Sequence, residues 1–355
     1  MRILLENIPG DPFRHCTGED TSGQNLFVLE LARHLARRGH QVDIATRATD
    51  PGDRLVNAVD KNLRILRVPS GPFEYLFRDR VADLIGIYTE RLLATLGEQN
   101  LRYHIVHSNY WLSIPVGLAV RAAGFSQRLV FTPHSLGRNK TRSTGIRNAR
   151  RDQLESEILQ AADCIHVLSD DDETRLRELY GGCRRVRTIR HAINPALFHY
   201  TPQHKARRRL GWRQEARILL FIGRFEPQKN LPAALRVFER LTAFRPAELD
   251  LEFVIAGGLS TTQPTEEDLP VDVWTAWKNM AVRERVRFLG RLPNDQLRWV
   301  YAGADALLMP SLYEPFGLVC AESVACGTPV AAYATGGLRE TITPGVNGLL
   351  VPVGD

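Results

Sequence analysis

The sequence contains few cysteines, and their spacing excludes the common zinc and redox motifs. Only five occur among the 355 residues, and no two of them form a Cys-x-x-Cys pair. Such spacing also argues against a disulfide framework, so we expect reduced and mostly buried thiols of the kind found in cytoplasmic proteins. The five are Cys16, Cys164, Cys183, Cys320 and Cys326.

Long apolar runs and metal-binding clusters are also absent. No run approaches the ~20 residues of a membrane-spanning helix, and the chain opens directly on an apolar strand pattern, Arg2–Ile8, without a signal peptide. The acids of Asp170–Asp172 precede a helical pattern, where the helix dipole stabilises them. We therefore predict a cytoplasmic protein with no membrane span, no catalytic metal and no bound cofactor.

Neither sign of charge dominates the composition. The 46 Lys and Arg residues exceed the 40 Asp and Glu residues by a net charge of +6. Much of this excess lies in two basic clusters, Gly137–Arg151 and Lys205–Arg209, and neither contains an aromatic residue that would stack on bases. The composition favours small anionic ligands over nucleic acid.

Short apolar runs alternate with helical patterns along the whole chain, which is typical of parallel βαβ units. In the first half we predict strands at Ile3–Ile8, Val42–Thr46, Leu63–Val68, His104–His107, Leu129–Thr132 and Cys164–Leu168, and helices at Gln24–Arg38, Val81–Leu96 and Arg151–Ala162. In the second half we predict strands at Ile218–Gly223, Leu251–Ala256, Val286–Leu289, Ala306–Met309, Pro329–Ala332 and Leu349–Val351.

The periodicity fails between Pro195 and Trp212, where polar and basic residues accumulate. We therefore predict an α/β fold of two Rossmann-like domains, residues 1–195 and 213–355, joined by a linker at 196–212 and facing across a cleft that holds the ligand. The chain stops directly after its last predicted strand, where a further helix should cover the sheet. The C-terminal domain is therefore expected to be incomplete.

The stretch Ser311–Glu322 places two carboxylates around a predicted strand-to-helix turn, with the helix at Gly317–Cys326. Ligands of open α/β sheets bind at the carboxyl ends of strands. We predict that Glu314, in that loop, accepts hydrogen bonds from sugar hydroxyls and that Glu322 accepts them from a second diol such as a ribose. The spacing equally allows Glu314 to be an acid favoured by the helix dipole and Glu322 to be a solvated helix residue. Exposed N–H groups at the helix start would attract an anion; they belong to Phe316, Gly317 and Leu318.

Three further loops follow predicted strands. After Gly223, the cations Arg224 and Lys229 flank a proline and are predicted to clamp a diphosphate, although they also fit a pair of solvated loop cations. His134 follows a strand end and is either a functional residue or a satisfied structural histidine. In the loop Thr17–Gly23, glycines at 18 and 23 would let the backbone approach a ligand, but a polar loop with a helix cap fits equally well.

Two of these segments together resemble the donor-site motifs of family 4 retaining glycosyltransferases with the GT-B fold. They are Gly223–Asn230 and Glu314–Glu322, and the likeness continues through Gly327–Val330, Gly336–Gly337 and Gly345–Leu349. The resemblance implies that Arg224 and Lys229 hold the donor diphosphate and that Glu314 holds the donor sugar. It also implies that the N–H groups after Glu314 bind the same sugar or phosphate and that Glu322 binds the ribose.

The first half looks similar to two subfamilies that use phosphorylated acceptors. Asp20–Gln24, Thr46–Arg47 and His134–Lys140 look like sucrose-phosphate synthases, while Val68–Glu74, His107–Ser113 and Thr46–Thr49 look like the inositol-phosphate glycosyltransferases of mycothiol synthesis. The resemblance places Gly23 at the donor and His134 beside the donor sugar. It implies a site for acceptor phosphate at Arg78, Tyr110, Lys140 and Arg151. Ser22 departs from the usual Gly-Gly pair, and Arg190–Asn194 stands where the family has a Pro-Pro-Gly turn.

We therefore expect a metal-independent retaining glycosyltransferase that moves a hexose from a nucleotide sugar, UDP-glucose, to a phosphorylated sugar such as fructose 6-phosphate. Alternatives are an inositol phosphate or other acceptor, and a non-catalytic module that only binds nucleotide sugars. A nicotinamide-dependent oxidoreductase is disfavoured because no Gly-x-Gly-x-x-Gly follows a strand. The sequence leaves the oligomeric state open.

Overall fold

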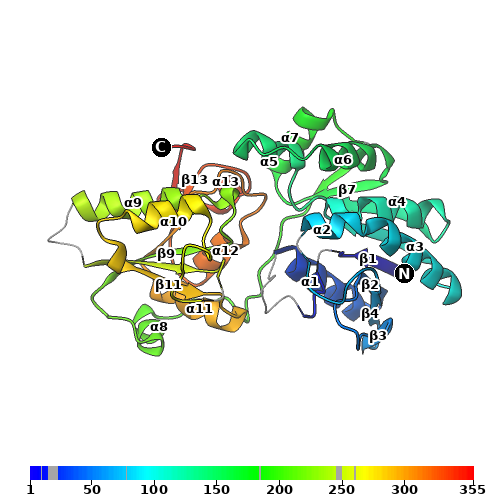
Figure 1. The fold of residues 1–355 in the computed structure, drawn as a ribbon, viewed down its shortest axis with the longest axis horizontal. Coiled ribbons are helices and arrows are strands. Elements are labelled where there is room, and N and C mark those ends of the chain that lie inside the picture. Colours follow the sequence, from blue (N-terminus) through cyan, green and yellow to red (C-terminus); the bar gives the residue numbers. More distant parts are fainter. Residues whose placement is uncertain (9, 15–22, 77, 184, 245–249, 260) are drawn as a thin grey trace. The chain divides into compact units, whose positions relative to one another are not determined.

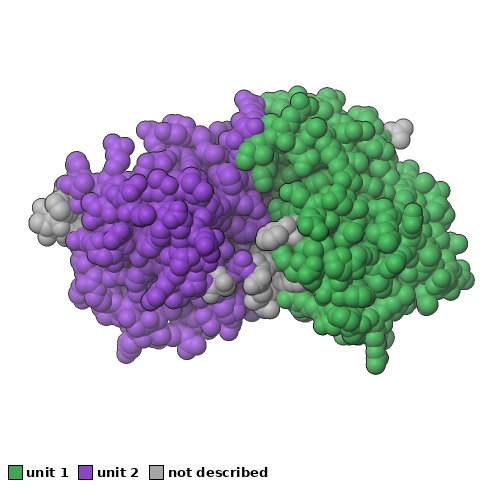
Figure 2. Space-filling view, in the orientation of Figure 1, with its two compact units in different colours: residues 1–141, 146–189 green, residues 142–145, 190–355 purple. Residues whose placement is uncertain are grey.

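The chain divides into two compact units in the computed structural model, which describes residues 1–8, 10–14, 23–76, 78–183, 185–244, 250–259 and 261–355. Unit 1 comprises Met1–Thr141 and Ile146–Ile189, and unit 2 comprises Arg142–Gly145 and Arg190–Asp355 (Figure 2). Among the described residues, no helix is both long and apolar enough to cross a membrane.

Unit 1 is built on an eight-stranded sheet in the order β3-β4-β2-β1-β5-β6-β7-β8 (Figure 1). All neighbouring strands pair in parallel except β3, which runs antiparallel to β4. The strands are β1 Arg2–Glu6, β2 Gln41–Arg47, β3 Val56–Asp60, β4 Leu63–Val68, β5 Tyr103–Asn109, β6 Ser126–Thr132, β7 Cys164–Val167 and β8 Val186–Thr188. Its helices are α1 Gly23–Arg37, α2 Arg78–Asp83, α3 Ile85–Glu98, η1 Trp111–Ser113, α4 Ile114–Ala122, α5 Gly137–Thr144, α6 Ala149–Ala161 and α7 Asp170–Tyr180.

Successive residues of β1 enter different hydrophobic clusters, as expected for a strand that is buried on both faces. Ile3 and Leu5 pack with Val28 and Ala32 of α1. Leu4 instead packs in the cluster that contains the buried apolar residues of α3, α4 and α6. The sheet of unit 1 is therefore covered by α1 on one face and by the other three helices on the opposite face.

Unit 2 has a six-stranded, all-parallel sheet in the order β11-β10-β9-β12-β13-β14. The strands are β9 Arg217–Ile222, β10 Leu251–Ala256, β11 Val286–Gly290, β12 Ala306–Met309, β13 Val330–Tyr333 and β14 Gly348–Val351. The helices are α8 Gln203–Leu210, η2 Pro227–Lys229, α9 Leu231–Phe244, α10 Val271–Lys278, η3 Arg283–Arg285, α11 Asn294–Gly303, α12 Leu318–Ala325 and α13 Leu338–Thr341. Two parallel-sheet α/β domains were predicted, and this prediction is confirmed.

Twelve strands were predicted, and the bounds of each lie within one or two residues of the prediction, apart from β6, which begins three residues earlier. The single helix predicted at Val81–Leu96 is wrong, because the chain turns at Leu84 between α2 and α3. Leu84 packs so closely against Gly71 that a Cβ built at Gly71 would lie 2.6 Å from the Leu84 side chain. Apolar residues on both sides of the turn keep the same helical spacing, so periodicity could not reveal the break.

The segment 196–212, predicted as a linker, contains α8 and belongs to unit 2. Arg207 of α8 is buried, donates through Nε to the Gly303 carbonyl at 2.9 Å, and pairs with Asp305 at 2.6 Å. The basic run that suggested a linker thus contains a cation that ties α8 to the loop after α11.

Two local predictions can be compared directly with the structure. The acids 170–172 open α7, where the Ser169 side chain accepts a hydrogen bond from the Asp172 N–H, so their placement at a helix start is confirmed. Cys320 and Cys326 are buried, whereas Cys164 and Cys183 are only half-buried; all four are free thiols. Cys16 lies outside the described residues.

Candidate functional site

Unit 1 gathers the four residues predicted to bind acceptor phosphate. Tyr110 follows β5 with a positive φ of 71° and is buried. The guanidinium carbons of Arg78 and Arg151 lie 5.3 and 5.0 Å from the centroid of its ring. Burial alone would raise the pKa of Tyr110, but the charges of Arg151, Arg78 and Lys140 outweigh it and lower the pKa. Three cations from α2, α5 and α6 therefore surround one phenol.

Arg151 is held rigidly inside this cluster. It is buried on the first turn of α6, which is capped by the Asn148 side chain. Its Nε donates to Glu155 Oε1 at 2.6 Å, and its Nη2 donates to the Ser135 carbonyl. Burial would lower the pKa of Arg151, but the Glu155 carboxylate, together with Tyr110 and Tyr180, outweighs burial and raises it. The guanidinium therefore stays charged in a dry site.

Glu155 was not identified from the sequence. Its second oxygen, Oε2, accepts hydrogen bonds from the Gly137 N–H at 2.8 Å and from the Tyr180 hydroxyl, so one carboxylate joins α5, α6 and α7. The sequence predicted the helix at Arg151–Ala162 but not the burial of its charges. The i, i+4 spacing of Arg151 and Glu155 was the available signal, but spacing does not reveal whether such a pair faces water or the interior.

His134 lies just past β6 in a left-handed backbone conformation, with φ of 56°. Its Nε2 donates to Asn109 Oδ1 at 3.0 Å, and its ring packs against Phe27 with 5.0 Å between ring centroids. A positive φ is uncommon for a residue other than glycine and marks a position that its surroundings hold in place. This geometry fits a residue with a fixed orientation.

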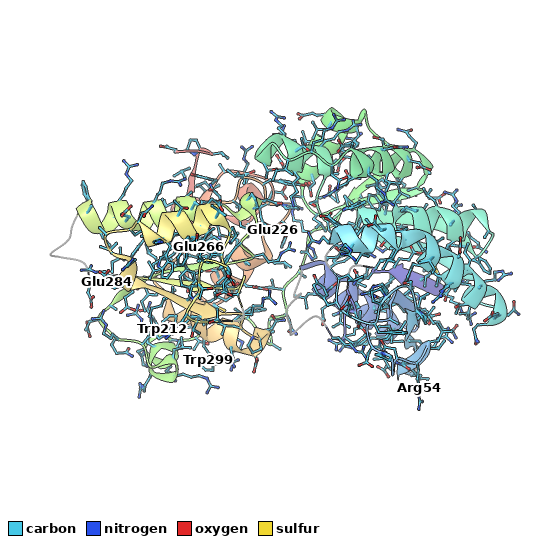
Figure 3. The ribbon with its side chains drawn as sticks, viewed as in Figure 1. Arg54, Trp212, Glu226, Glu266, Glu284 and Trp299 are labelled. Atoms are coloured by element: carbon cyan, nitrogen blue, oxygen red, sulfur yellow. The ribbon has the colours of Figure 1, made fainter. Side chains whose placement is uncertain are left out.

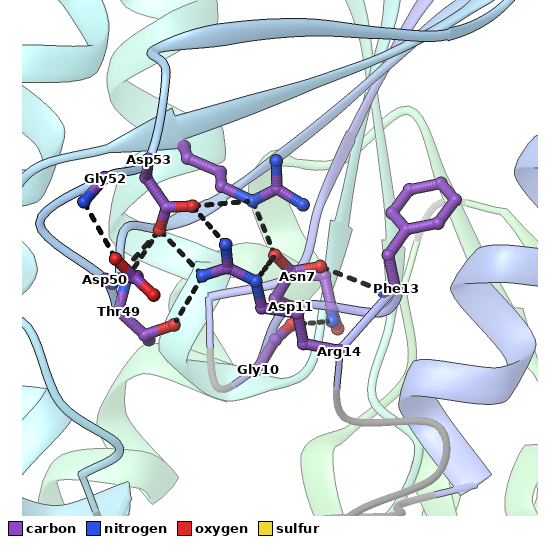
Figure 4. Close-up of polar contacts among 10 residues, drawn as sticks. Asn7, Gly10, Asp11, Phe13, Arg14, Thr49, Asp50, Gly52 and Asp53 are labelled. Carbon is purple, nitrogen blue, oxygen red and sulfur yellow. Dashed lines mark hydrogen bonds and ion pairs between the residues drawn. The ribbon is translucent and has the colours of Figure 1, made fainter.

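The loop before α1 is described only in part. Gly23 is the exposed first residue of α1, whereas Gly18, Ser22 and the rest of 15–22 lie outside the described residues. Residues 10–14 are fixed by a network of ion pairs (Figure 4). In this network Asp11 accepts from Arg67 Nε at 2.6 Å, and Arg14 pairs with Asp53 at 2.6 Å. This long-range network was not predicted from the sequence.

Unit 2 brings Lys229 and Glu314 together. Lys229 Nζ donates to Glu314 Oε2, although the two residues are 85 positions apart. Gln228 joins the same two loops, because its side chain donates to the Tyr313 carbonyl at 2.6 Å and its own carbonyl accepts from the Leu312 N–H at 2.9 Å. Glu314 is buried. The pair therefore forms one preorganised group of cation and carboxylate.

Arg224 is more accessible than Lys229. Its Nη1 lies 2.8 Å from Oε1 of Glu226, the residue labelled in Figure 3, and its side chain is 42% exposed, compared with 20% for Lys229. Two solvated loop cations were the alternative interpretation. It fits Arg224 better than Lys229, which is held by a buried carboxylate.

Glu322 is not a solvated helix residue, so that alternative is wrong. It is buried on α12, and the Tyr301 hydroxyl donates to its Oε2 at 2.7 Å. Burial raises the pKa of Glu322 to about 7, even though the hydrogen bond from Tyr301 lowers it. The sequence did not identify Tyr301, which lies on a different helix, α11.

The backbone after Glu314 leads directly into α12, at the helix start where an anion site was predicted. Gly317, with φ of 91°, is the cap of α12. Within the described part of the chain, no protein group accepts a hydrogen bond from the N–H groups of Phe316, Gly317 or Leu318. Helix-start N–H groups in this state attract anionic oxygen.

Gly337 packs closely against the loop that follows Glu314 and bonds to it. The Gly337 N–H donates to the Glu314 carbonyl at 2.9 Å, and a Cβ on Gly337 would lie 2.6 Å from Phe316 Cα.

We expect Gly337→Ala to destabilise unit 2 by about 1–3 kcal/mol through overpacking, seen as a lower urea midpoint. Gly86→Ala on α3, where a Cβ meets nothing within 4 Å, is the matched control. Equal midpoints for Gly337→Ala and the unmodified protein would contradict the prediction.

No group of three or more His, Cys, Asp or Glu side chains among the described residues could hold a metal ion. The described residues of the two sites provide cations, carboxylates, backbone N–H groups and one imidazole of fixed orientation.

Two family profiles together match most of the chain. The profile described as Glycosyl transferase 4-like domain matches residues 22–192, and the one described as Glycosyl transferases group 1 matches residues 202–355. The D-inositol 3-phosphate glycosyltransferase of Corynebacterium diphtheriae is 32% identical over 360 residues, covering 99% of this chain and 83% of that protein. The enzyme of the same name from Mycobacteroides abscessus is 33% identical over 361 residues, covering 99% of this chain and 78% of that protein.

Solved structures of similar fold cover the whole chain. The sucrose-phosphate synthase of Thermosynechococcus elongatus has a TM-score of 0.88 and 32% identity, covering 100% of this chain and 86% of that chain. Anabaena HepE in complex with UDP and glucose has a TM-score of 0.72 and 19% identity, with coverage of 100% and 86%. The second likeness concerns the fold alone.

Proposed function

The chain belongs to the group 1 glycosyltransferases of GT-B fold, and we propose that it transfers a hexose with retention from a nucleotide sugar, UDP-glucose, to a phosphorylated sugar such as fructose 6-phosphate. The observation that carries the acceptor class is the packing of Arg78, Lys140 and Arg151 around Tyr110. Three cations around one phenol supply the multiple charged donors that a phosphate dianion needs. No bound metal or cofactor enters the proposed reaction.

The donor set lies in unit 2. In this proposal, Lys229 and Arg224 bind the diphosphate, and the N–H groups of residues 316–318 bind the same phosphates or the sugar. Glu314 accepts from sugar hydroxyls through the oxygen that Lys229 does not bond. Glu322 accepts from the ribose diol, and the Tyr301 hydroxyl fixes the orientation of its carboxylate.

The chemistry of transfer is electrostatic. The bond between the anomeric carbon and the β-phosphate oxygen breaks, and the acceptor hydroxyl oxygen forms the new bond on the same face of the sugar. The acceptor proton passes to the departing diphosphate. Lys229 and Arg224 stabilise the charge that develops on the leaving group, and the preorganised Lys229–Glu314 pair requires little rearrangement to do so. His134, with its orientation fixed by Asn109, contacts the donor sugar.

A coupled assay tests the proposal. UDP-glucose is mixed with fructose 6-phosphate, UDP release is measured, and the product is examined by NMR for retention at the anomeric carbon. Inositol 3-phosphate is the second acceptor to test, because relatives with that activity in their names are 32–33% identical. Calorimetric binding of UDP without release from any phosphorylated acceptor would indicate a binding module instead.

The raised pKa of Glu322 predicts pH-dependent donor binding. The ribose hydroxyls donate to a carboxylate, so only the ionised form accepts both, and protonation near pH 7 weakens the complex. With a pKa of about 7, affinity for UDP-glucose should be roughly tenfold lower at pH 6 than at pH 8. Because the folded-state pKa lies above the ordinary value of 4.5, the stability that protonated Glu322 contributes is lost as pH rises through 7.

Calorimetry with UDP-glucose at the two pH values measures this dependence, since a diphosphate diester does not itself titrate near neutrality. Glu322→Gln is the matched control, because it keeps the size of the side chain and removes its titration. The variant should bind with the same affinity at both pH values. An equally steep pH dependence in Glu322→Gln would assign the titration to another group.

A further inference from the structure

A chain of hydrogen bonds crosses the carboxyl ends of three neighbouring strands in unit 1. His107 of β5 bonds through Nε2 to the Thr132 hydroxyl of β6 at 2.7 Å. The same hydroxyl bonds to Nδ1 of His166 on β7 at 2.9 Å. His166 Nε2 then bonds to the Ile189 carbonyl at 2.8 Å. All three side chains are buried, so water does not compete for these bonds.

The donor and acceptor roles of these groups determine where each proton lies in this chain of hydrogen bonds. A carbonyl only accepts, so His166 Nε2 carries a proton and donates to Ile189. In a neutral ring Nδ1 is then an acceptor and takes the single hydroxyl proton of Thr132. The hydroxyl oxygen must therefore accept from His107 Nε2. Burial lowers the pKa of His107 to about 3 and also lowers that of His166, which agrees with two neutral rings.

Two points along this chain of hydrogen bonds matter for the proposed reaction. Ile189 is the last residue of unit 1, and its N–H also donates to the Val167 carbonyl of β7 at 3.0 Å. At the centre, Thr132 is the last residue of β6 and precedes His134 by two positions.

The imidazole of His134 also belongs to this assembly. The ring of Phe27 lies 5.0 Å from the ring of His134, 5.6 Å from that of His166 and 6.5 Å from that of His107, measured between centroids. Asn109 donates to the His107 carbonyl at 3.1 Å, which turns its Oδ1 toward His134. The three rings thus share one apolar wall, and His134 is bonded to the same strand as His107.

We propose that Thr132 and His166 are positioning residues that hold the His134 turn in its left-handed conformation and fix the strand end where the chain leaves unit 1. Neither residue contacts substrate in this proposal; both act through His134, whose contact with the donor sugar rests on the proposed function. Threonine suits the central place because one hydroxyl both accepts from His107 and donates to His166, while its methyl group fills apolar space.

Imidazole ¹⁵N NMR tests the hydrogen-bond chain without any substrate. His107 and His166 should both appear as neutral Nε2–H tautomers with shifts that stay constant from pH 6 to 8. Thr132→Val keeps the shape of the side chain and removes the hydroxyl, so it should shift the ring signals of His166, His107 and His134. Thr132→Ser should retain the wild-type pattern. Titration of either buried ring in that range, or His134 signals unchanged in Thr132→Val, would overturn the proposal.

Kinetics test the consequence for transfer. Thr132→Val should lower kcat by roughly 10- to 100-fold, as misplacement of a positioned group does, and leave the affinity of unit 2 for UDP unchanged. Thr132→Ser should restore most of the rate. Thr188→Val is the matched control, because it removes a threonine hydroxyl that bonds Glu173 outside this chain. A Thr132→Val enzyme that is less stable yet fully active would show a merely structural role and contradict the proposal.

The two experiments separate this inference from the proposed function. If the unmodified protein releases no UDP with any acceptor, the proposed function fails. The tautomers and the His134 signals still decide whether the chain of hydrogen bonds positions the His134 ring. If transfer occurs and Thr132→Val is as active as the wild type, the positioning role fails and the proposed function stands.

Discussion

Replacing Lys229 by alanine is expected to lower kcat for hexose transfer by roughly 100- to 1,000-fold, the usual cost of losing one preorganised group that stabilises charge in a transition state. The reason lies in its geometry. Lys229 ends the short η2 helix and donates to Glu314, which is buried. Its remaining N–H groups are free of that bond to meet a departing diphosphate. In the variant the cation is gone and the Glu314 charge would repel the leaving group.

Glu314 offers a way to separate these two causes. In Lys229→Ala combined with Glu314→Gln, the repulsive carboxylate is removed, so any recovery of rate measures its contribution. We expect partial recovery only, because the diphosphate still lacks its cation. Lys205→Ala, on the exposed face of α8, is the control for a general loss of positive charge. Initial rates of UDP release decide the matter, and a Lys229→Ala rate within threefold of wild type would remove Lys229 from the mechanism.

The pairing of Lys229 with Glu314 shows where sequence reasoning reached its limit. Both residues were predicted to lie at strand ends on the ligand edge, because short apolar runs located β9 and β12. Nothing in a one-dimensional pattern shows that β9 and β12 are neighbours, which is the fact that brings the two loops together. Local periodicity predicts elements, whereas the order of strands in a sheet depends on contacts between distant segments.

Two strands, β3 and β8, were not predicted, and the reason is related. Most of β3 is exposed at the sheet edge and none of its residues is buried, and β8 is only three residues long. They lie at opposite ends of the sheet, where one side of the strand has no neighbouring strand. Fewer residues of an edge strand therefore need to be apolar. Central strands such as β4 and β10, buried on both faces, were predicted to the residue.

Buried charged and polar side chains were also not predicted. Glu155, Tyr301 and Arg207 were not identified from the sequence, yet Glu155 and Arg207 are buried ions and the Tyr301 hydroxyl orients Glu322. Their partners come from other segments, so the sequence provides no pattern for them. The resemblance located Arg151 but not the carboxylate that holds it.

Replacing Arg151 by methionine is expected to destabilise unit 1 by about 3–5 kcal/mol, since removing one partner of a buried ion pair leaves the other charge uncompensated. Glu155 would keep its bonds from Gly137 and Tyr180 but lose its only charged partner among the described contacts. Where the variant remains folded, the KM for a phosphorylated acceptor should rise, because one of the three cations around Tyr110 is missing. Urea unfolding and acceptor kinetics measure the two effects separately.

The double variant Arg151→Met with Glu155→Gln distinguishes the two roles of Arg151. A glutamine carbonyl can still accept from the Gly137 N–H, and no buried charge remains, so much of the lost stability should return. The KM for the acceptor should stay high, since neither substitution restores a cation beside Tyr110. Arg150→Met, on the neighbouring half-exposed arginine, is the matched control and should change both quantities little. Recovery of acceptor binding together with stability would mean that Arg151 serves the fold alone, and Arg78 and Lys140 would then carry the phosphate site.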